Sequence, residues 1–373
     1  MSMLVPLNDP KRRFIAAKNA LIAQFAEFIE RGCFIGGADV LNFEERFAAW
    51  TGRRYSVAVA NGTDALELAA RAGGVAAGDE VITVANAGGY ATTACSAIGA
   101  TPVYVDVNWE DAQIDHEMAL AAVTDRTRAI VVTHLFGLRN HVLPIRRKLI
   151  ELERGDIRII EDFAQAHGAS LGLGMPGSGG LIACYSFYPT KNLGALGDAG
   201  AITTDDPDLA STVRRLREYG WVSKYCNQTP NGRNSRMDSL QAVVLAHALD
   251  DVATANVIRR DIFRRYGGVL PSGWRLIGED SERFVAHLCV LVAPDRESRA
   301  RMTKHLEGLH IACAVHYPVL DVDQPAWRGY GRSAGDLATS YRLLDRILTI
   351  PCFPEMYEDE IASVSAALET FKS

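Results

Sequence analysis

The sequence lacks the features that mark several classes of protein. It has no Cys-x-x-Cys pair, and its seven cysteines are scattered along the chain. Such an odd, unpatterned set argues against a disulfide framework or a zinc site and is typical of reduced thiols in a cytoplasm. No apolar run approaches the roughly 18 residues that a membrane span requires, and the first residues do not resemble a signal peptide. Basic residues are not in excess, since the net charge is −6. We therefore expect a cytoplasmic protein whose main partner is neither a nucleic acid nor a membrane.

Short apolar segments alternate with segments of helical periodicity in the first half of the chain. Two amphipathic helices are expected first, one over residues 12–31 and one that ends at Gly52. Further helices are expected between strands, which fall at residues 55–60, 81–84, 102–107, 128–134 and 157–160. This alternation predicts βαβ units and a mostly parallel sheet covered by helices on both faces. In such sheets a ligand lies at the carboxyl ends of the strands.

The second half of the chain has a different pattern. Residues 208–265 predict helices joined by a polar loop at 222–234. Shorter elements follow from Pro271, with helices expected at 296–308 and 358–371 and apolar segments at 284–292 and 311–316. At 373 residues the chain is long enough for two domains. We expect N-terminal helices and a large domain in residues 1–250, and a smaller α/β domain in residues 251–373.

Residues 183–203 predict a strand, an exposed Gly-rich turn with Lys191, and a second strand. Within seven residues on either side, Lys191 has no other cation near it and a single carboxylate, Asp198. A lysine in this mostly neutral setting loses its proton more easily, because desolvation disfavours the ammonium. The neutral amine can form a Schiff base with an aldehyde cofactor. An ordinary turn lysine is the alternative for this stretch taken alone.

Three other positions lie at predicted strand ends and offer groups for a cofactor. Residues 61–64 begin a helix with a glycine, so their backbone N–H groups can bind a phosphate, or Asn61 or Thr63 simply caps the helix. Asp162 can hold the proton of a pyridinium ring, or it caps a helix as well. Ser186, five residues before Lys191, either binds phosphate or is an ordinary serine at the end of a strand.

Two apparent ligand motifs are rejected. Residues 172–177 match the pattern G-x-G-x-x-G, but no clean strand precedes them, and Pro176 stands where a helix should begin. The acidic residue of a dinucleotide site is also missing, so we reject that interpretation. His134 and His167 have no Cys or His partner at metal-ligand spacing. Structural roles are therefore favoured for both histidines, and no metal site is expected.

Ten short motifs occur together in a recognisable order. They include NGTDALEL at 61–68, EDFAQAHG at 161–168, SFYPTKNLG at 186–194 and VHYP at 315–318, with others at 34–37, 43–47, 78–82, 102–107, 134–137 and 232–238. From about residue 31 to 356 the chain thus resembles the sugar aminotransferases of the DegT/DnrJ/EryC1/StrS family. The resemblance implies an α/β fold of the aspartate aminotransferase-like kind (fold type I), with a large domain that binds pyridoxal phosphate and a smaller C-terminal α/β domain.

The resemblance also implies roles for individual residues. Lys191 forms the Schiff base with pyridoxal phosphate, Asp162 pairs with the pyridine nitrogen, and Gln165 contacts the phenolic oxygen of the ring. His316, in the last motif, is expected to contact the substrate. The phosphate is held by Gly62, Thr63, Ser186 and, from the neighbouring subunit, Asn234. The active unit is therefore expected to be a homodimer.

Two positions depart from the family pattern. Family members often place an aromatic residue over the cofactor ring just after the strand that ends near Val84. Here residues 86–90 read Asn-Ala-Gly-Gly-Tyr, with glycine where the aromatic residue is expected. We expect Tyr90 to stack on the ring instead. Tyr188 stands where histidine is common, and this puts nothing essential in doubt.

The resemblance implies that the chain aminates a keto group of a nucleotide-linked deoxysugar, carried on dTDP or GDP, with L-glutamate as the donor. Residues 86–90 and 233–238 are more similar to family members that act at C3, so amination at C3 is expected and C4 is the alternative. A non-catalytic regulator that binds the cofactor or a sugar nucleotide is a second alternative. Retention of the catalytic residues argues against such a regulator. Sugar dehydratases that resemble this family have histidine in place of the Schiff-base lysine, so Lys191 favours transamination over dehydration.

The loop at 221–236 is expected to line the entrance to the site. Lys224, Arg233 and Arg236 offer cations for a diphosphate, and Tyr225 or Trp221 offers a ring for a sugar or a base. A solvated loop without a specific role is the alternative.

Overall fold

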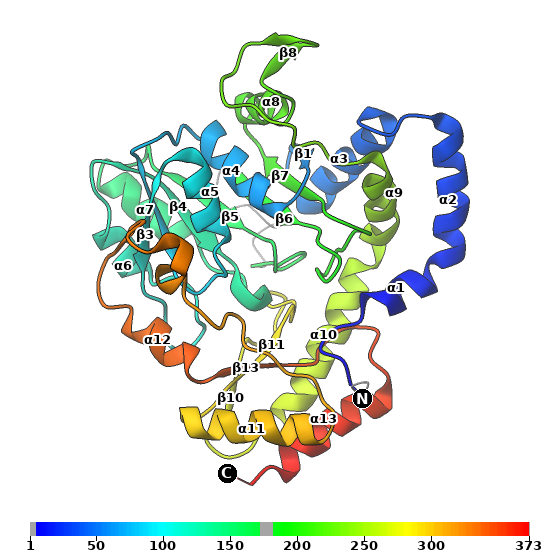
Figure 1. Cartoon of the computed structure of the whole chain (residues 1–373), viewed down its shortest axis with the longest axis vertical. Helices are drawn as coiled ribbons and strands as arrows, with labels where there is room; N and C mark the ends of the chain where they lie inside the picture. Colours follow the sequence, from blue (N-terminus) through cyan, green and yellow to red (C-terminus); the bar gives the residue numbers. More distant parts are fainter. Residues whose placement is uncertain (1–4, 172–181, 373) are drawn as a thin grey trace.

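The protein is described here by a computed structural model that covers residues 5–171 and 182–372. Its largest sheet has eight strands in the order β1-β7-β6-β5-β4-β2-β3-β12 (Figure 1). β7 runs antiparallel to β1 and β6, and the other neighbours are parallel, so the predicted mostly parallel sheet is confirmed. The strands are β1 (Tyr55–Val59), β2 (Glu80–Val84), β3 (Thr101–Val105), β4 (Thr127–Thr133), β5 (Arg158–Asp162), β6 (Ile182–Ser186), β7 (Gly200–Thr204) and β12 (Arg332–Ser333).

Helices cover both faces of this sheet because successive strand side chains point to opposite sides. On β6, Ile182 and Cys184 pack with helices α4, α5 and α8, whereas Ala183 and Tyr185 pack with α3 and α9. Helices α6 and α7 pack against β2, β3 and β4. The bounds of these helices are α3 (Gly37–Thr51), α4 (Gly62–Ala72), α5 (Tyr90–Ile98), α6 (His116–Ala121), α7 (Leu143–Glu151), α8 (Pro207–Leu216) and α9 (Ser239–Ala248).

The C-terminal part of the chain builds a second hydrophobic core around an antiparallel sheet of order β10-β11-β13. One of its short segments, β12, leaves this part and pairs with β3 at the edge of the large sheet. The division at residue 250 stays a prediction. The elements of this part are α10 (Val252–Gly267), β10 (Arg275–Ile277), β11 (Cys289–Val292), α11 (Arg296–Gly308), α12 (Ala338–Leu344), β13 (Ile347–Ile350) and α13 (Glu358–Thr370). Single turns of 3₁₀-helix occur at η1 (Leu135–Gly137), η2 (Leu249–Asp251), η3 (Asp321–Asp323) and η4 (Pro325–Trp327).

The helix expected over residues 12–31 is divided at Ala17 into α1 (Pro10–Ala16) and α2 (Lys18–Arg31). The two halves pack on different partners. In α1, Arg12 and Arg13 pair with Glu360 and Glu355 near the C-terminus, whereas α2 packs on α9. No described helix is both long enough and apolar enough to cross a membrane.

Three segments of the second half differ in detail from their sequence patterns. The apolar segment 284–292 becomes a strand only at β11, because Ala286 has a left-handed φ of 43° and Val285 N–H donates to the Gly137 carbonyl instead. Residues 311–316 form single bridges with Val5 and Thr349 rather than a strand. The polar loop contains a hairpin of β8 (Trp221–Ser223) and β9 (Cys226–Asn227).

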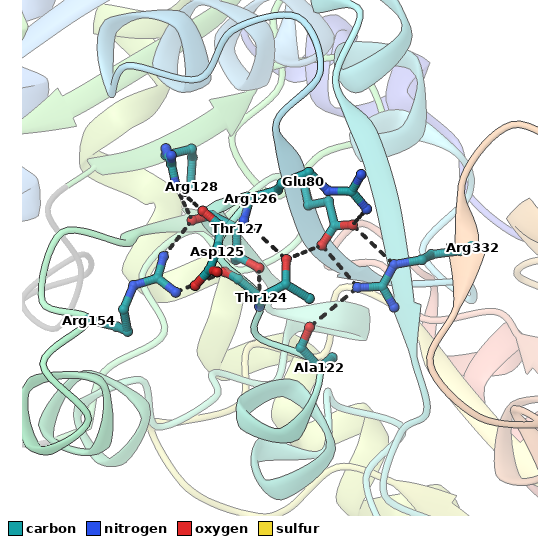
Figure 2. A network of polar contacts seen from close by, with 9 residues as sticks. All are labelled: Glu80, Ala122, Thr124, Asp125, Arg126, Thr127, Arg128, Arg154 and Arg332. Carbon is teal, nitrogen blue, oxygen red and sulfur yellow. Dashed lines mark hydrogen bonds and ion pairs between the residues drawn. The ribbon is translucent and has the colours of Figure 1, made fainter.

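A buried carboxylate attaches β12 to the large sheet. Glu80 begins β2, is 1% exposed, and accepts hydrogen bonds from Arg332 (2.9 Å), Arg126 (2.6 Å) and Thr124 (2.7 Å). Figure 2 shows these donors gathered around the Glu80 carboxylate. The hydrogen bond from Arg332 is the largest cause that lowers the pKa of Glu80 to about 2, against the opposing effect of burial. The Glu80 carboxylate thus joins β12 to β2 and to the turn that precedes β4, which are far apart in the sequence.

We expect Glu80→Gln to lower the free energy of unfolding by about 1–3 kcal/mol at pH 7, because the amide cannot pair with two arginines. The folded pKa lies below the ordinary value of 4.5, so the carboxylate stabilises the fold fully above pH 4.5. The difference from the wild type should therefore shrink as the pH falls toward 2. Urea unfolding at pH 7 and pH 3 measures it. Glu30→Gln on the exposed face of α2 is the control, and an equal loss in both variants would contradict the prediction.

Candidate active site

A cavity of about 430 Å³ opens at the carboxyl ends of the parallel strands. Asn61 follows β1, Asp162 ends β5 and Ser186 ends β6, and all three line the cavity. The opposite wall comes from the C-terminal part of the chain, including His316, Tyr317 and Thr349. The site therefore lies where the parallel sheet predicts it.

The first turn of α4 forms one end of the cavity. Asn61 caps this helix, since its side chain accepts from Asp64 N–H at 2.8 Å. The N–H groups of Gly62 and Thr63, in the same turn, have no acceptor within the helix and lie at the positive end of its dipole. A Cβ on Gly62 would lie 2.6 Å from the Cβ of Ser186, so glycine is needed to bring this turn against the serine. The three residues together offer an N–H and hydroxyl cradle for a phosphate.

Lys191 and Asp162 both line the cavity. The turn that carries Lys191 is closed by its own N–H, which donates to the Tyr188 carbonyl at 2.8 Å. Burial lowers the pKa of Lys191 to about 8, and the nearby charge of Asp162 opposes this shift. Burial raises the pKa of Asp162, while the hydrogen bond from Ala164 N–H (3.0 Å) opposes that shift. Lys191 thus carries an amine that is more easily deprotonated than an ordinary lysine.

Gln165 and Tyr317 line the cavity and are hydrogen-bonded to each other. Gln165 accepts from Phe136 N–H at 2.6 Å and donates its Nε2 to the Tyr317 hydroxyl at 2.9 Å. Tyr90, at the start of α5, meets the Tyr317 ring edge to face at 6.4 Å. Gly88 lies under that ring, because a Cβ there would come within 2.8–2.9 Å of three of its carbon atoms. Gly88, one of the two glycines in the stretch that departs from the family pattern, thus makes room for Tyr317.

We expect Gly88→Ala to force the Tyr317 ring to move, with loss of its bond to Gln165 and about 1–3 kcal/mol of stability. Gly32→Ala is the matched control. Gly32 has a similar left-handed φ of 68°, against 81° for Gly88, but a Cβ there would have nothing within 4 Å. Urea unfolding of both variants separates the clash from backbone strain. Equal destabilisation would show that the contact with Tyr317 does not matter.

The described residues fit pyridoxal phosphate on their chemistry. The cradle at Gly62, Thr63 and Ser186 suits the phosphate, Lys191 suits the aldehyde, and Asp162 suits a ring nitrogen that carries a proton. A sequence model of the DegT/DnrJ/EryC1/StrS aminotransferase family matches residues 16–369. The chain belongs to this family. It is an aminotransferase, and its cofactor is pyridoxal phosphate.

Relatives of this aminotransferase span nearly its whole length. It is 34% identical over 368 residues to a dTDP-3-amino-3,4,6-trideoxy-alpha-D-glucose transaminase of Streptomyces venezuelae, covering 98% of this chain and 95% of the relative. It is 32% identical to a UDP-N-acetyl-3-dehydro-alpha-D-glucosamine 3-aminotransferase of Acidithiobacillus ferrooxidans, covering 98% and 97%. The crystal structure of NtdA from Bacillus subtilis with bound cofactor PMP superposes with a TM-score of 0.90 at 29% identity, covering 99% of this chain and 85% of that one. The predicted fold class is confirmed.

The structure brings eight of the predicted site residues of this aminotransferase into one cavity. They come from the ends of two strands and the loops that follow them, from the starts of two helices and from the C-terminal part: Gly62, Thr63, Tyr90, Asp162, Gln165, Ser186, Lys191 and His316. His316 is positioned by a contact of 2.9 Å between its Nδ1 and the Thr349 hydroxyl. The role of each residue stays a prediction.

The other five predicted residues lie away from this cavity in the same chain. Lys224, Tyr225 and Arg236 line a second hollow of about 610 Å³ beside the start of α3. Arg233 pairs with Asp64 and Glu67 of α4. The remaining residue, Asn234, accepts from Arg236 Nε at 3.0 Å. Their predicted contacts with the cofactor or the substrate stay predictions.

The two histidines set aside as structural lie in the packed interior. His134 Nδ1 accepts from Asn140 N–H at 3.0 Å, so its proton is on Nε2, which faces Glu161 at 3.2 Å. His167 packs against the rings of Tyr185 and Phe187. Within the described ranges, no three His, Cys, Asp or Glu side chains are grouped to hold a metal. Residues 172–177, whose dinucleotide interpretation was rejected, lie outside the described residues.

Sequence reasoning missed three residues of the site. Tyr317 follows His316 in the motif at 315–318. Its hydroxyl accepts a hydrogen bond from Gln165, a partner that the motif alone did not indicate. His287 lines the cavity from within an apolar segment. Asn192, next to Lys191, holds His287 at 2.9 Å. The sequence offered one signal for His287 and Asn192, namely that His287 is a lone histidine in the otherwise apolar segment 284–292.

Proposed function

We propose that this aminotransferase converts the keto group at C3 of a nucleotide-linked deoxysugar, carried on dTDP or GDP, into an amine, with L-glutamate as the amino donor. The observation that supports transamination most directly is that Lys191, with a lowered pKa, and Asp162 line the same cavity. The nucleotide sugar is inferred from relatives whose names describe 3-amino sugars on dTDP or UDP. Those names favour dTDP over GDP and C3 over C4.

Bound pyridoxal phosphate supplies an aldehyde that captures an amine and a ring that accepts electrons from the adjacent carbon. The chain's own residues would do the rest. Lys191 Nζ, with a pKa of about 8, takes a proton from one carbon and returns it to another in the neutral pH range. Asp162, ionised, holds a proton on the ring nitrogen. The turn of α4 with Ser186 fixes the phosphate, so that Lys191 stays within reach of the reacting carbon.

The proposed active unit is a homodimer. Lys191 is the one lysine or arginine among the described residues that line the cavity, so this chain alone brings no further cation for a sugar diphosphate. Lys224 lies on the exposed hairpin, with its ammonium over the ring of Tyr225, and Arg236, which follows the hairpin in the chain, lies over the ring of Tyr219 and lines the same hollow. We infer that the hairpin of one copy, together with Asn234, completes the site of the other. Sedimentation equilibrium of the active enzyme should therefore give the mass of a dimer. The mass of a monomer for a fully active enzyme would contradict this arrangement.

The acceptor can be identified by a half-reaction. L-glutamate should bleach the visible absorption band of the purified holoenzyme and release 2-oxoglutarate. The reduced enzyme is then mixed with 3-keto and 4-keto deoxysugars on dTDP, GDP and UDP. We expect a dTDP-linked 3-keto sugar to restore the band fastest. Recovery with a 4-keto sugar alone would overturn the assignment to C3, and a protein that neither bleaches nor releases 2-oxoglutarate would overturn the use of glutamate.

A further inference from the structure

A closed network of buried amides lies behind the turn that carries Lys191. Asn192 is 3% exposed, and its Nδ2 donates to the Val285 carbonyl at 3.1 Å and to Asn256 Oδ1 at 2.8 Å. Asn256, also 3% exposed, donates its own Nδ2 to the His167 carbonyl at 2.8 Å. The network therefore ties the turn to α10 and to the segment that leads into β11.

Two backbone carbonyls fix the direction of every hydrogen bond in this network. A carbonyl can only accept, so the amide atoms that face Val285 and His167 must be the nitrogens of Asn192 and Asn256. The oxygen of Asn192 is then the atom that faces His287 Nδ1, at 2.9 Å. His287 must donate from Nδ1 to make this bond. In its neutral form the ring therefore has its proton on Nδ1 and its lone pair on Nε2.

His287 also lines the cavity, close enough to Lys191 for its charge to matter. Burial, followed by the positive charge of Lys191, lowers the pKa of His287 well below its usual range. The ring therefore stays neutral near pH 7. It lines the cavity and, through its Nδ1, contacts Asn192, the residue next to Lys191. Arg13 adds a bond from the other side, because its Nη1 donates to the Lys191 carbonyl at 3.1 Å.

We propose that His287 is a positioning residue, which holds Lys191 in place through the bond from its Nδ1 to Asn192. This inference rests on the proposed role of Lys191. Loss of the bond leaves Asn192 with an unpaired buried acceptor, and the turn regains freedom to move. Small displacements of a catalytic group cost large factors in rate, so the effect should appear in the steps that need Lys191.

Three substitutions of His287 separate the two nitrogens. Asparagine places its amide N–H near the Nδ1 position and keeps the bond to Asn192, but it has nothing at Nε2. Glutamine places its amide near Nε2 and loses the bond to Asn192, and alanine loses both. Asn256→Ala is a second probe that disturbs the network from α10, away from the cavity wall. His305→Asn, on α11, controls for replacing a partly buried histidine, since His305 contacts the Ala367 carbonyl instead.

The measurements use the holoenzyme. They are the single-turnover rate of bleaching by L-glutamate, the pH midpoint of the visible band, and the fraction of chains in which borohydride fixes the cofactor to the Lys191 peptide. We expect His287→Ala and His287→Gln to slow bleaching by about tenfold and to shift the midpoint by about half a pH unit or more, and His287→Asn to recover to within about threefold. Asn256→Ala should act in the same direction as His287→Ala.

The inference is overturned if His287→Asn is as impaired as His287→Ala while His287→Gln is active, because His287 would then act directly from Nε2. It is also overturned if His287→Ala and Asn256→Ala both remain within twofold of the wild type. Lys191→Ala is measured alongside. If that variant still bleaches with glutamate, the proposed role of Lys191 fails, which is a separate result from a failure of the His287 network.

Discussion

Replacement of Lys191 by alanine is expected to stop transamination while the fold remains intact. The side chain opens onto the cavity rather than into the packed core, so its removal creates no internal void. It does remove the amine that attaches the cofactor and moves the proton. Loss of a positioned acid–base group alone costs about 10²–10⁴-fold in rate, and loss of the attachment adds to this. Steady-state release of 2-oxoglutarate from glutamate, with added pyridoxal phosphate, measures the effect.

One control variant and two further measurements accompany this prediction. Lys148→Ala removes an exposed lysine of α7 that pairs with Glu151, and it should leave the rate unchanged. Borohydride should fix the cofactor to the wild type and to Lys148→Ala but not to Lys191→Ala. Thermal unfolding should give similar midpoints for the wild type, Lys148→Ala and Lys191→Ala. Substantial turnover by a folded Lys191→Ala protein would show that another group supplies the amine.

Asp162→Asn is expected to give the second largest loss, about 10²-fold or more in kcat/KM. The substitution keeps the shape of the side chain, and its oxygen can still accept from Ala164 N–H. It removes the negative charge that can hold a proton on the ring nitrogen. It also removes the charge that opposes the lowered pKa of Lys191, so this pKa should fall further below about 8.

The pH profile distinguishes this explanation from a general loss of structure. In the wild type, activity should fall at low pH as Asp162 takes up a proton, at a pH above the ordinary aspartate range because burial raises its pKa. That low-pH limb should disappear in Asp162→Asn, because asparagine does not titrate. Asp250→Asn, an exposed partner of Arg46, is the control. An unchanged rate and an unchanged profile in Asp162→Asn would overturn the assignment.

The sequence by itself was sufficient to predict the fold class and the place of the site. Strands rich in apolar residues alternate with helices, and this period permits a parallel sheet with a ligand at its carboxyl edge. Asp162 and Ser186 follow two such strands, and Gly62 opens a helix after a third. Their meeting in one cavity follows from the shared direction of these strands, whose carboxyl ends lie at the same edge of the sheet. The isolation of Lys191 in a neutral turn predicts a lowered pKa, and burial in the folded chain shifts the pKa in the same direction.

What only the tertiary structure decided concerns side chains that meet across long stretches of chain. His287 lies 95 residues from Asn192, and Tyr317 lies 152 residues from Gln165, so no local pattern pairs them. Glu80 meets Arg332 because β12 returns to the edge of the large sheet. The tertiary structure also decided the place of the hairpin formed by β8 and β9, whose Lys224 lines a different hollow from Lys191 in the same chain. Periodicity specifies which face of an element is buried, whereas packing in three dimensions selects the partner of each buried polar group.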